Sequence, residues 1–163
     1  MPSSRGSDTS GSRSTRSGEG ANTRSLHRVA FSGGSLAHWA LFLPDEDGSA
    51  EGTLVHVGVE TGSSGVKRNH RVRVKKIRVT RSSARSVHVI SGASITRTIL
   101  EQVAKDIFNR KGYNVATNNC QHFCFDVIAE LNRLYPDLVP QSAVDDMRRN
   151  GTTITNVTNF LRG

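Results

Sequence analysis

A short segment around Cys120 holds the residues best suited to chemistry. It reads Asn118-Asn119-Cys120-Gln121-His122-Phe123-Cys124 and precedes a helical apolar pattern. In the first turn of a helix, the dipole and the unpaired backbone N–H groups stabilise a cysteine thiolate. The same N–H groups can donate to an oxyanion. Cys120 is therefore predicted to be a thiol nucleophile supported by Asn119 and Gln121, and the alternative is a buried structural thiol.

Two histidines lie far upstream in apolar segments that are typical of strands. His38 lies in segment 36–43, where Trp39 is predicted to support the substrate, and His56 lies in segment 54–58. We expect His38 to take the thiol proton and His56 to orient or polarise His38. If the two strands pair antiparallel and facing residue numbers sum to an even value such as 94 or 96, the two histidines share one face of the sheet. If the sum is odd, the histidines face apart and a two-histidine site fails. The alternative for each histidine is that a backbone carbonyl of the sheet satisfies it.

The remaining cysteine and histidines are given structural roles. Cys124, one helical turn beyond Cys120, is expected in the core, and His122 is expected to buttress the site. His27, His70 and His88 are expected at the surface. A single C-x₃-C pair lacks the second ligand pair that structural zinc requires, so neither a metal nor a cofactor is expected.

Basic residues are concentrated in one segment of this chain of net charge +8. The segment is a candidate basic patch, and its members are Lys67, Arg68, Arg71, Arg73, Lys75, Lys76, Arg78 and Arg81. Such a patch suits an anionic membrane surface or an acidic protein, while the simplest alternative is a solvated strand face. Nucleic acid is not expected, because no aromatic platform is interleaved with the charges.

Composition divides the 163 residues into a domain and two tails. Residues 1–25 are rich in Ser, Gly and Arg and are predicted to be disordered, residues 26–150 to form one domain, and residues 151–163 to form a loose tail. The chain has no run of about 18 apolar residues and no apolar signal region, so no membrane-spanning helix and no secretion are expected. We expect a reducing compartment, the cytoplasm or alternatively the nucleus.

Hydrophobic periodicity predicts an α+β domain in which the histidine strands precede the cysteine helix. Strands are expected over 26–32, 36–43, 53–59, 66–80 and 86–90. The fourth strand should be interrupted by a bulge at Lys75-Lys76, and the fifth should end at 91–94. Helices are expected over 95–109 and from Cys120 to Pro136, with a short last helix capped by Ser142. An antiparallel sheet would thus pack on the helices.

Three motifs together resemble the lecithin retinol acyltransferase-like (LRAT-like) group. They are His38-Trp39-Ala40-Leu41-Phe42, Val55-His56-Val57 and Asn118-Asn119-Cys120-Gln121-His122-Phe123. The resemblance implies a circularly permuted papain-like fold with Cys120 as nucleophile, His38 as base and His56 as third member. It also implies an acyl-thioester on the cysteine and hydrolysis or transfer of lipid acyl groups. Gln121 stands where that group has an acidic residue.

The segment Tyr113-Asn114-Val115 before Asn119-Cys120, with the Phe123 helix after it, is also similar to the PPPDE family of permuted papain-like isopeptidases. That resemblance implies one histidine, one cysteine and removal of ubiquitin-like proteins, with no need for His56. A third alternative is a member of the same fold that has no catalysis and binds a partner through its basic face.

Overall fold

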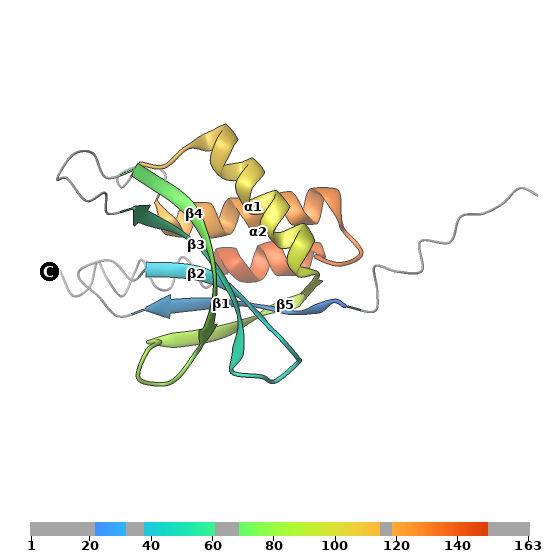
Figure 1. The fold of residues 1–163 in the computed structure, drawn as a ribbon. Coiled ribbons are helices and arrows are strands. Elements are labelled where there is room, and N and C mark those ends of the chain that lie inside the picture. Colours follow the sequence, from blue (N-terminus) through green and yellow to red (C-terminus); the bar gives the residue numbers. More distant parts are fainter. Residues whose placement is uncertain (1–21, 32–37, 61–68, 115–118, 150–163) are drawn as a thin grey trace, which may run out of the picture.

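The computed structural model describes residues 22–31, 38–60, 69–114 and 119–149. Within these ranges the chain forms five strands, then helices α1 and α2, then a third helical segment at residues 141–149. This arrangement confirms the predicted α+β class, with an antiparallel sheet packed on helices (Figure 1). The first strand begins at Arg24, two residues before the predicted domain start. The rest of the two predicted tails lies outside the described residues.

One five-stranded antiparallel sheet organises the domain, in the order β4-β3-β2-β1-β5. The strands are β1 (Arg24–Phe31), β2 (His38–Pro44), β3 (Glu51–Glu60), β4 (Asn69–Arg78) and β5 (Ser86–Ile95). Strands β1 to β4 follow one another as neighbours, and β5 then pairs with β1 at the opposite edge (Figure 1). This order makes β2 an inner strand and places β4 and β5 at the edges.

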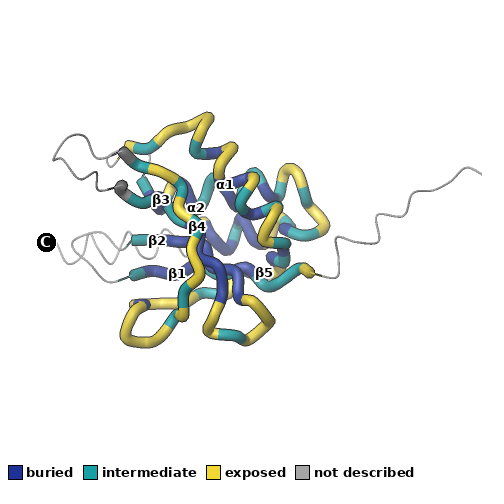
Figure 2. Tube along the Cα trace, viewed as in Figure 1, coloured by how far each residue is buried: buried dark blue, intermediate teal, exposed yellow. Residues whose placement is uncertain are grey.

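Strand β2 is apolar on both faces, as its sequence predicts. Trp39 and Leu41 point toward the helices and belong to the main core, while Ala40 and Phe42 point to the other face and form a smaller cluster with Leu54. Successive side chains of a strand alternate between faces, so a doubly buried strand must be apolar throughout. In Figure 2 the inner strands are largely buried, whereas the edge strand β4 is largely exposed.

Helix α1 (Arg97–Lys111) and helix α2 (Cys120–Leu134) cover one face of the sheet. The buried stripe of α1 is Leu100, Val103, Ala104 and Ile107, and that of α2 contains Phe123, Val127, Ile128 and Leu131. Residues at these spacings lie on one side of a helix, which explains why both helices were predictable. No helix among the described residues is long and apolar enough to cross a membrane.

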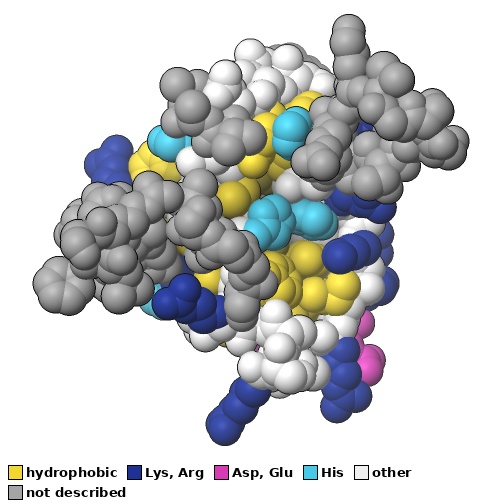
Figure 3. All heavy atoms as spheres, turned by 90° about the vertical axis from the view of Figure 1, so that its left-hand side faces the viewer, with side chains coloured by type: hydrophobic (Ala, Val, Ile, Leu, Met, Phe, Trp, Pro, Cys, Tyr) yellow, Lys and Arg dark blue, Asp and Glu magenta, His cyan; other side chains and the backbone are white. Residues whose placement is uncertain are grey.

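The opposite face, which we call the open face, carries no helix from the part of the chain that the structure describes. Its small cluster is completed by half-buried Phe31, Ile77 and Val79. Figure 3 views the molecule from the end at which β2 begins, where histidine side chains lie against apolar surface and several Lys and Arg side chains lie near them. The open face is therefore partly apolar, and no second layer from the described residues packs on it.

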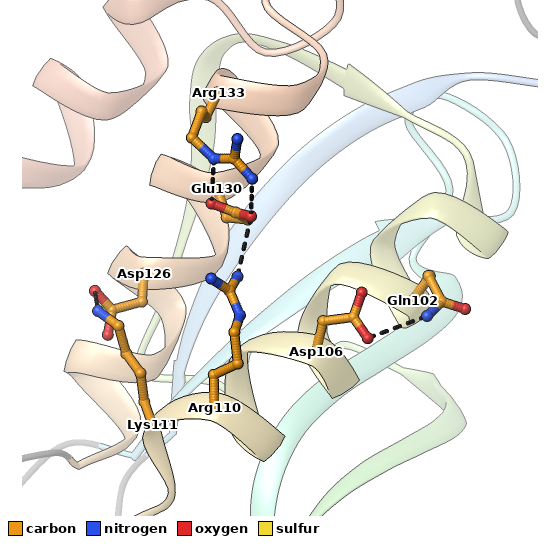
Figure 4. Close-up of polar contacts among 7 residues, drawn as sticks. All are labelled: Gln102, Asp106, Arg110, Lys111, Asp126, Glu130 and Arg133. Atoms are coloured by element: carbon orange, nitrogen blue, oxygen red, sulfur yellow. Dashed lines mark hydrogen bonds and ion pairs between the residues drawn. The ribbon is translucent and has the colours of Figure 1, made fainter.

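Ion pairs join the outer sides of α1 and α2 (Figure 4). Glu130 accepts hydrogen bonds from Arg110 at 3.0 Å and from Arg133 at 2.9 and 2.7 Å, and Lys111 lies 2.9 Å from Asp126. The hydrogen bonds from Arg133 are the main cause that lowers the pKa of Glu130 to about 2. The contacts of Arg110 and Lys111 join the end of α1 to the middle and second half of α2.

Three predicted element boundaries are wrong. Strand β4 has no bulge at Lys75-Lys76, because it keeps one register with β3 over its whole length and supplies apolar side chains to both faces. Strand β5 continues to Ile95, and a register shift against β1 absorbs residues 90–93 between the pairs Ser25–Ser94 and His27–Val89. The last helical segment begins at residue 141, so Ser142 lies inside its first turn and does not cap it.

Candidate active site

Cys120 is the first residue of α2, and Asn119 is its N-cap. The Asn119 side chain accepts hydrogen bonds from the backbone N–H groups of Gln121 at 3.0 Å and His122 at 3.3 Å. The first N–H groups of a helix have no partner within the helix, and an Asn side chain is well suited to satisfy them. The thiol thus lies at the positive end of the helix dipole, as the sequence predicts.

The Cys120 sulfur contacts the backbone of strand β2. The backbone N–H of Trp39 donates to Cys120 Sγ at 3.5 Å, and Cys120 is 7% exposed. Burial raises the pKa of the Cys120 thiol, while the backbone N–H groups of Trp39, Cys120 and Gln121 act in the opposite direction. The resting sulfur is therefore a neutral thiol that accepts the Trp39 N–H, and this N–H together with the positive helix end would favour negative charge formed during a reaction.

His38 and His56 form a direct pair. His38 Nε2 lies 3.0 Å from His56 Nδ1, and the two rings meet edge to face with centroids 5.1 Å apart. Facing residues of β2 and β3, such as Leu41 and Val55, sum to 96. The even sum confirms the predicted shared face, and the diagonal relation brings the two rings within hydrogen-bonding distance.

The histidine pair lies on the open face of the sheet, whereas Cys120 belongs to the core under the helices. His38 has the same parity as Ala40, and His56 the same parity as Leu54, and both apolar residues belong to the open-face cluster. Trp39 has the opposite parity and packs in the same core as Cys120. The thiol and the imidazoles therefore approach the start of β2 from its two sides.

One peptide unit links the two halves of the site. Trp39, whose N–H contacts the sulfur, directly follows His38 in the chain. His38 Nε2 is hydrogen-bonded to His56, whereas His38 Nδ1 has no hydrogen-bond partner among the described residues. Nδ1 is the ring nitrogen nearer to the side chain's own backbone. Of the two His38 ring nitrogens, Nδ1 is therefore separated by fewer bonds from the peptide that contacts Cys120.

Both imidazoles are held neutral near pH 7. Burial lowers the pKa of His38, and the charge of Lys75 lowers it further. Burial, then His38 and Lys75, lower the pKa of His56 to about 4. A neutral imidazole can accept a proton, so these environments suit a base better than a permanent cation.

Tyr113, which the sequence singles out only as part of the PPPDE-like segment, is a neighbour of the thiol. Burial raises the pKa of Tyr113, and Cys120 raises it further, while the backbone N–H of Cys120 lowers it. The Tyr113 ring stacks on His70 with centroids 4.1 Å apart. Tyr113 thus ties the start of α2 to the start of β4, and no local pattern in the sequence indicates this contact.

A second missed feature lies beneath Trp39. The Arg28 guanidinium sits 4.5 Å from the centre of the Trp39 ring, and Arg28 is 4% exposed. Asp146 of the last helical segment lies 2.8 Å from His88 and accepts the Ser91 backbone N–H at 2.8 Å. A buried arginine below the site and a carboxylate bridge to β5 therefore support the site from within the core.

The other predicted residues fall into clear groups. His122 Nδ1 lies 3.0 Å from Asn119 Oδ1, which is consistent with its buttressing role, and Cys124 is fully buried in the core as predicted. The predicted surface histidines His27, His70 and His88 are instead half-buried. Among the described residues, no three or more His, Cys, Asp or Glu side chains form a cluster able to hold a metal.

The basic patch does not form one face. Lys67 and Arg68 lie outside the described residues. Arg71, Arg73 and Lys75 alternate along the open face of β4, whereas the Lys76 ammonium contacts Asp45 and Arg78 lies 3.5 Å from Glu51. The cations toward the end of the strand are thus paired with carboxylates. Of the β4 cations, Lys75 lowers the pKa of the two histidines most.

Comparison with protein families assigns this chain to one family. Residues 26–134, from β1 to the end of α2, match the model of a family of unknown function, DUF6540, and the chain belongs to that family. Comparison with curated proteins and comparison with solved structures give no match. The matched span contains Cys120, His38 and His56.

Proposed function

We propose that this protein carries out thiol-dependent acyl chemistry at Cys120. One observation supports the proposal above all others: the sulfur of the first residue of helix α2 contacts the N–H of the residue that follows His38, and His38 is hydrogen-bonded to a second histidine. A nucleophile, a base and a group that orients the base are the three elements of covalent acyl transfer. The LRAT-like resemblance of the sequence names the same three residues.

In this mechanism His38 Nδ1 takes the thiol proton as Cys120 attacks an acyl carbonyl. The tetrahedral intermediate expels its leaving group, which receives the proton from His38, and an acyl-thioester remains on Cys120. Water or a second acceptor then attacks the thioester with His38 as base, and the free thiol returns. His56 holds the His38 ring through Nε2 and keeps Nδ1 available throughout.

The order of elements supports a permuted papain-like fold as the finer description. The histidine strands β2 and β3 precede the cysteine helix α2 in the chain, and the helix starts at the end of the sheet where β2 begins (Figure 1). The LRAT-like mechanism uses two histidines, whereas the PPPDE mechanism uses one. The His38–His56 hydrogen bond therefore favours the first, and an ester or amide of a lipid acyl group is the proposed substrate class.

A non-catalytic binding module is the second candidate, and the buried state of the thiol favours it. Burial raises the pKa of Cys120, so the resting protein holds no preformed thiolate at neutral pH. Under this alternative the histidines and the thiol stabilise the fold, and a partner binds through the cations of β4.

Alkylation kinetics test the proposal. Iodoacetamide at neutral pH should label Cys120 far faster than Cys124, and His38→Ala should abolish the preference. Cys124→Ala, which removes a fully buried thiol, is the matched control and should keep the fast reaction. Equally slow labelling of both thiols in the folded wild type would support the binding module.

Substrate turnover tests the acyl class. The protein is offered a fluorogenic phospholipid and a ubiquitin-like fusion side by side, with Cys120→Ser as the blank. Turnover of the phospholipid with a trapped thioester on Cys120 supports the proposal. Turnover of the fusion alone would replace the lipid by an isopeptide bond.

A further inference from the structure

A pocket of about 370 Å³ opens on the open face of the sheet, beside the histidine pair. Phe31, Leu54 and Ile77 give it an apolar lining, and His38 and His56 form another part of its wall. Pockets that hold small molecules span roughly 300–1,000 Å³ and are mostly apolar with a few polar groups. This pocket therefore has the size for one short chain and lies on the side of the sheet away from the Cys120 core.

The charged residues in the lining are both cations, Lys75 and Arg78. Arg78 has a carboxylate nearby, Glu51 at 3.5 Å, and both of these side chains are well exposed. Lys75 has no ion-pair partner among the residues that the structure describes. An unpaired ammonium at the edge of an apolar pocket suits an anionic group joined to a hydrocarbon.

The histidine wall contains a buried nitrogen without a partner among the described residues. This nitrogen is His56 Nε2. A buried polar atom without a partner is uncommon in folded proteins and is often completed by a ligand or water. Because His56 lines the pocket, this buried nitrogen lies within the pocket wall.

We infer that this pocket binds a free single-chain anionic amphiphile, with its phosphate or carboxylate at Lys75 and its hydrocarbon chain on Phe31, Leu54 and Ile77. The site shares the histidine pair with the proposed thiol chemistry, but Lys75 and the apolar residues Phe31, Leu54 and Ile77 take no part in that chemistry. Binding should also change the pKa values of the two histidines. Lys75 lowers the pKa of both His38 and His56, so an anion on Lys75 relieves that effect and raises both pKa values.

Isothermal titration calorimetry on the full chain tests the site, with decyl phosphate and decanoate kept below their micelle-forming concentrations. Both amphiphiles should bind at one site per chain, whereas decanol and inorganic phosphate should bind at least tenfold more weakly. Lys75→Met should weaken binding at least fivefold. Lys76→Met is the matched control, since the neighbouring Lys76 contacts Asp45 and does not line the pocket, and it should change affinity less than twofold.

Two further measurements locate the ligand. Cys120→Ser should bind decyl phosphate like the wild type, because Cys120 does not line the pocket, and this result tests binding independently of the proposed acyl chemistry. Imidazole NMR titrations should give higher pKa values for His38 and His56 when the site is saturated.

Four results would overturn the inference. They are the absence of saturable binding, equal binding of decanol, unchanged affinity in Lys75→Met, and binding to phosphatidylglycerol vesicles without any binding of the monomeric amphiphile. The last result would assign the cations to a membrane surface.

Discussion

Substituting Gly58 with alanine tests whether the histidine pair controls the thiol. Gly58 lies two residues after His56 on the same face of β3. A Cβ atom at position 58 would lie 2.5 Å from Arg73 Cδ and 3.2 Å from His56 Cε1. The exposed Arg73 side chain is flexible and can swing away. The His56 ring is packed and must move by a few tenths of an ångström, which would lengthen its 3.0 Å hydrogen bond to His38.

The size of the effect follows from that hydrogen bond. A typical intramolecular hydrogen bond has a net value of about 0.5–1.5 kcal/mol. Since about 1.4 kcal/mol corresponds to a tenfold change in rate, weakening the pair should slow alkylation of Cys120 by roughly two- to tenfold. Alanine gains about 0.5–1 kcal/mol over glycine inside a strand, which offsets the local crowding. We therefore expect the free energy of unfolding to stay within about 1 kcal/mol of the wild type.

The assay follows iodoacetamide labelling of Cys120 and Cys124 by peptide mass spectrometry, with urea unfolding measured on the same samples. Arg73→Ala is the control for charge, because Arg73 makes the smallest contribution among the groups that lower the pKa of His56. The double variant with Gly58→Ala removes the arginine contact and leaves the contact with His56. It should react as slowly as Gly58→Ala alone.

One result would refute the reasoning. If Gly58→Ala is folded and Cys120 reacts within a factor of 1.5 of the wild type, the geometry of the His38–His56 pair has no influence on the thiol. The mechanism proposed above would then lose the role given to His56.

Three more predictions concern stability and protonation. Asn119→Ala removes the acceptor at the start of α2 and should lower the free energy of unfolding by about 1 kcal/mol, measured by urea denaturation; no loss would mean that water caps the helix equally well. Burial raises the pKa of Asp146, but the Ser91 N–H and His88 lower it more, so its folded pKa lies below the ordinary 3.8. The stability that ionised Asp146 gives the fold is complete above pH 3.8 and is lost as the pH falls through the folded pKa. Asp146→Asn should therefore be less stable than the wild type at pH 7, and the difference in unfolding free energy should shrink in acid. A difference that stays constant with pH would contradict the assignment. Because burial raises the pKa of Cys120, ultraviolet titration should give thiolate only above the pH at which a free cysteine ionises, and thiolate at neutral pH would point to an ion pair with His38.

The local parts of the site are determined by the sequence. Residue spacing fixes the stripe of α2, the type of residue at position 119 fixes its cap, and the two-residue period of β2 and β3 puts both histidines on one face once the register is even. These features depend on neighbours a few residues apart in the chain or on a single pairing. They could therefore be predicted before any coordinates were known.

Other features depend on which strands become neighbours and on how the sheet twists. The uninterrupted β4 could not be predicted from its shifted pattern, because one edge strand packs Val74 against the helices and Ile77 against the open-face cluster. Likewise, an arginine in β1 gave no sign that it would be buried over Trp39.

The relation between thiol and histidines belongs to the tertiary structure alone. The sequence supplied the residue types at Cys120, His38 and His56. Only the packing of α2 on the sheet selected the Trp39 N–H as the sulfur's partner, 81 positions away in the chain, and left the imidazoles facing the other side. Contacts at such separations are set by layer order and strand twist, which the spacing of residues along a chain does not encode.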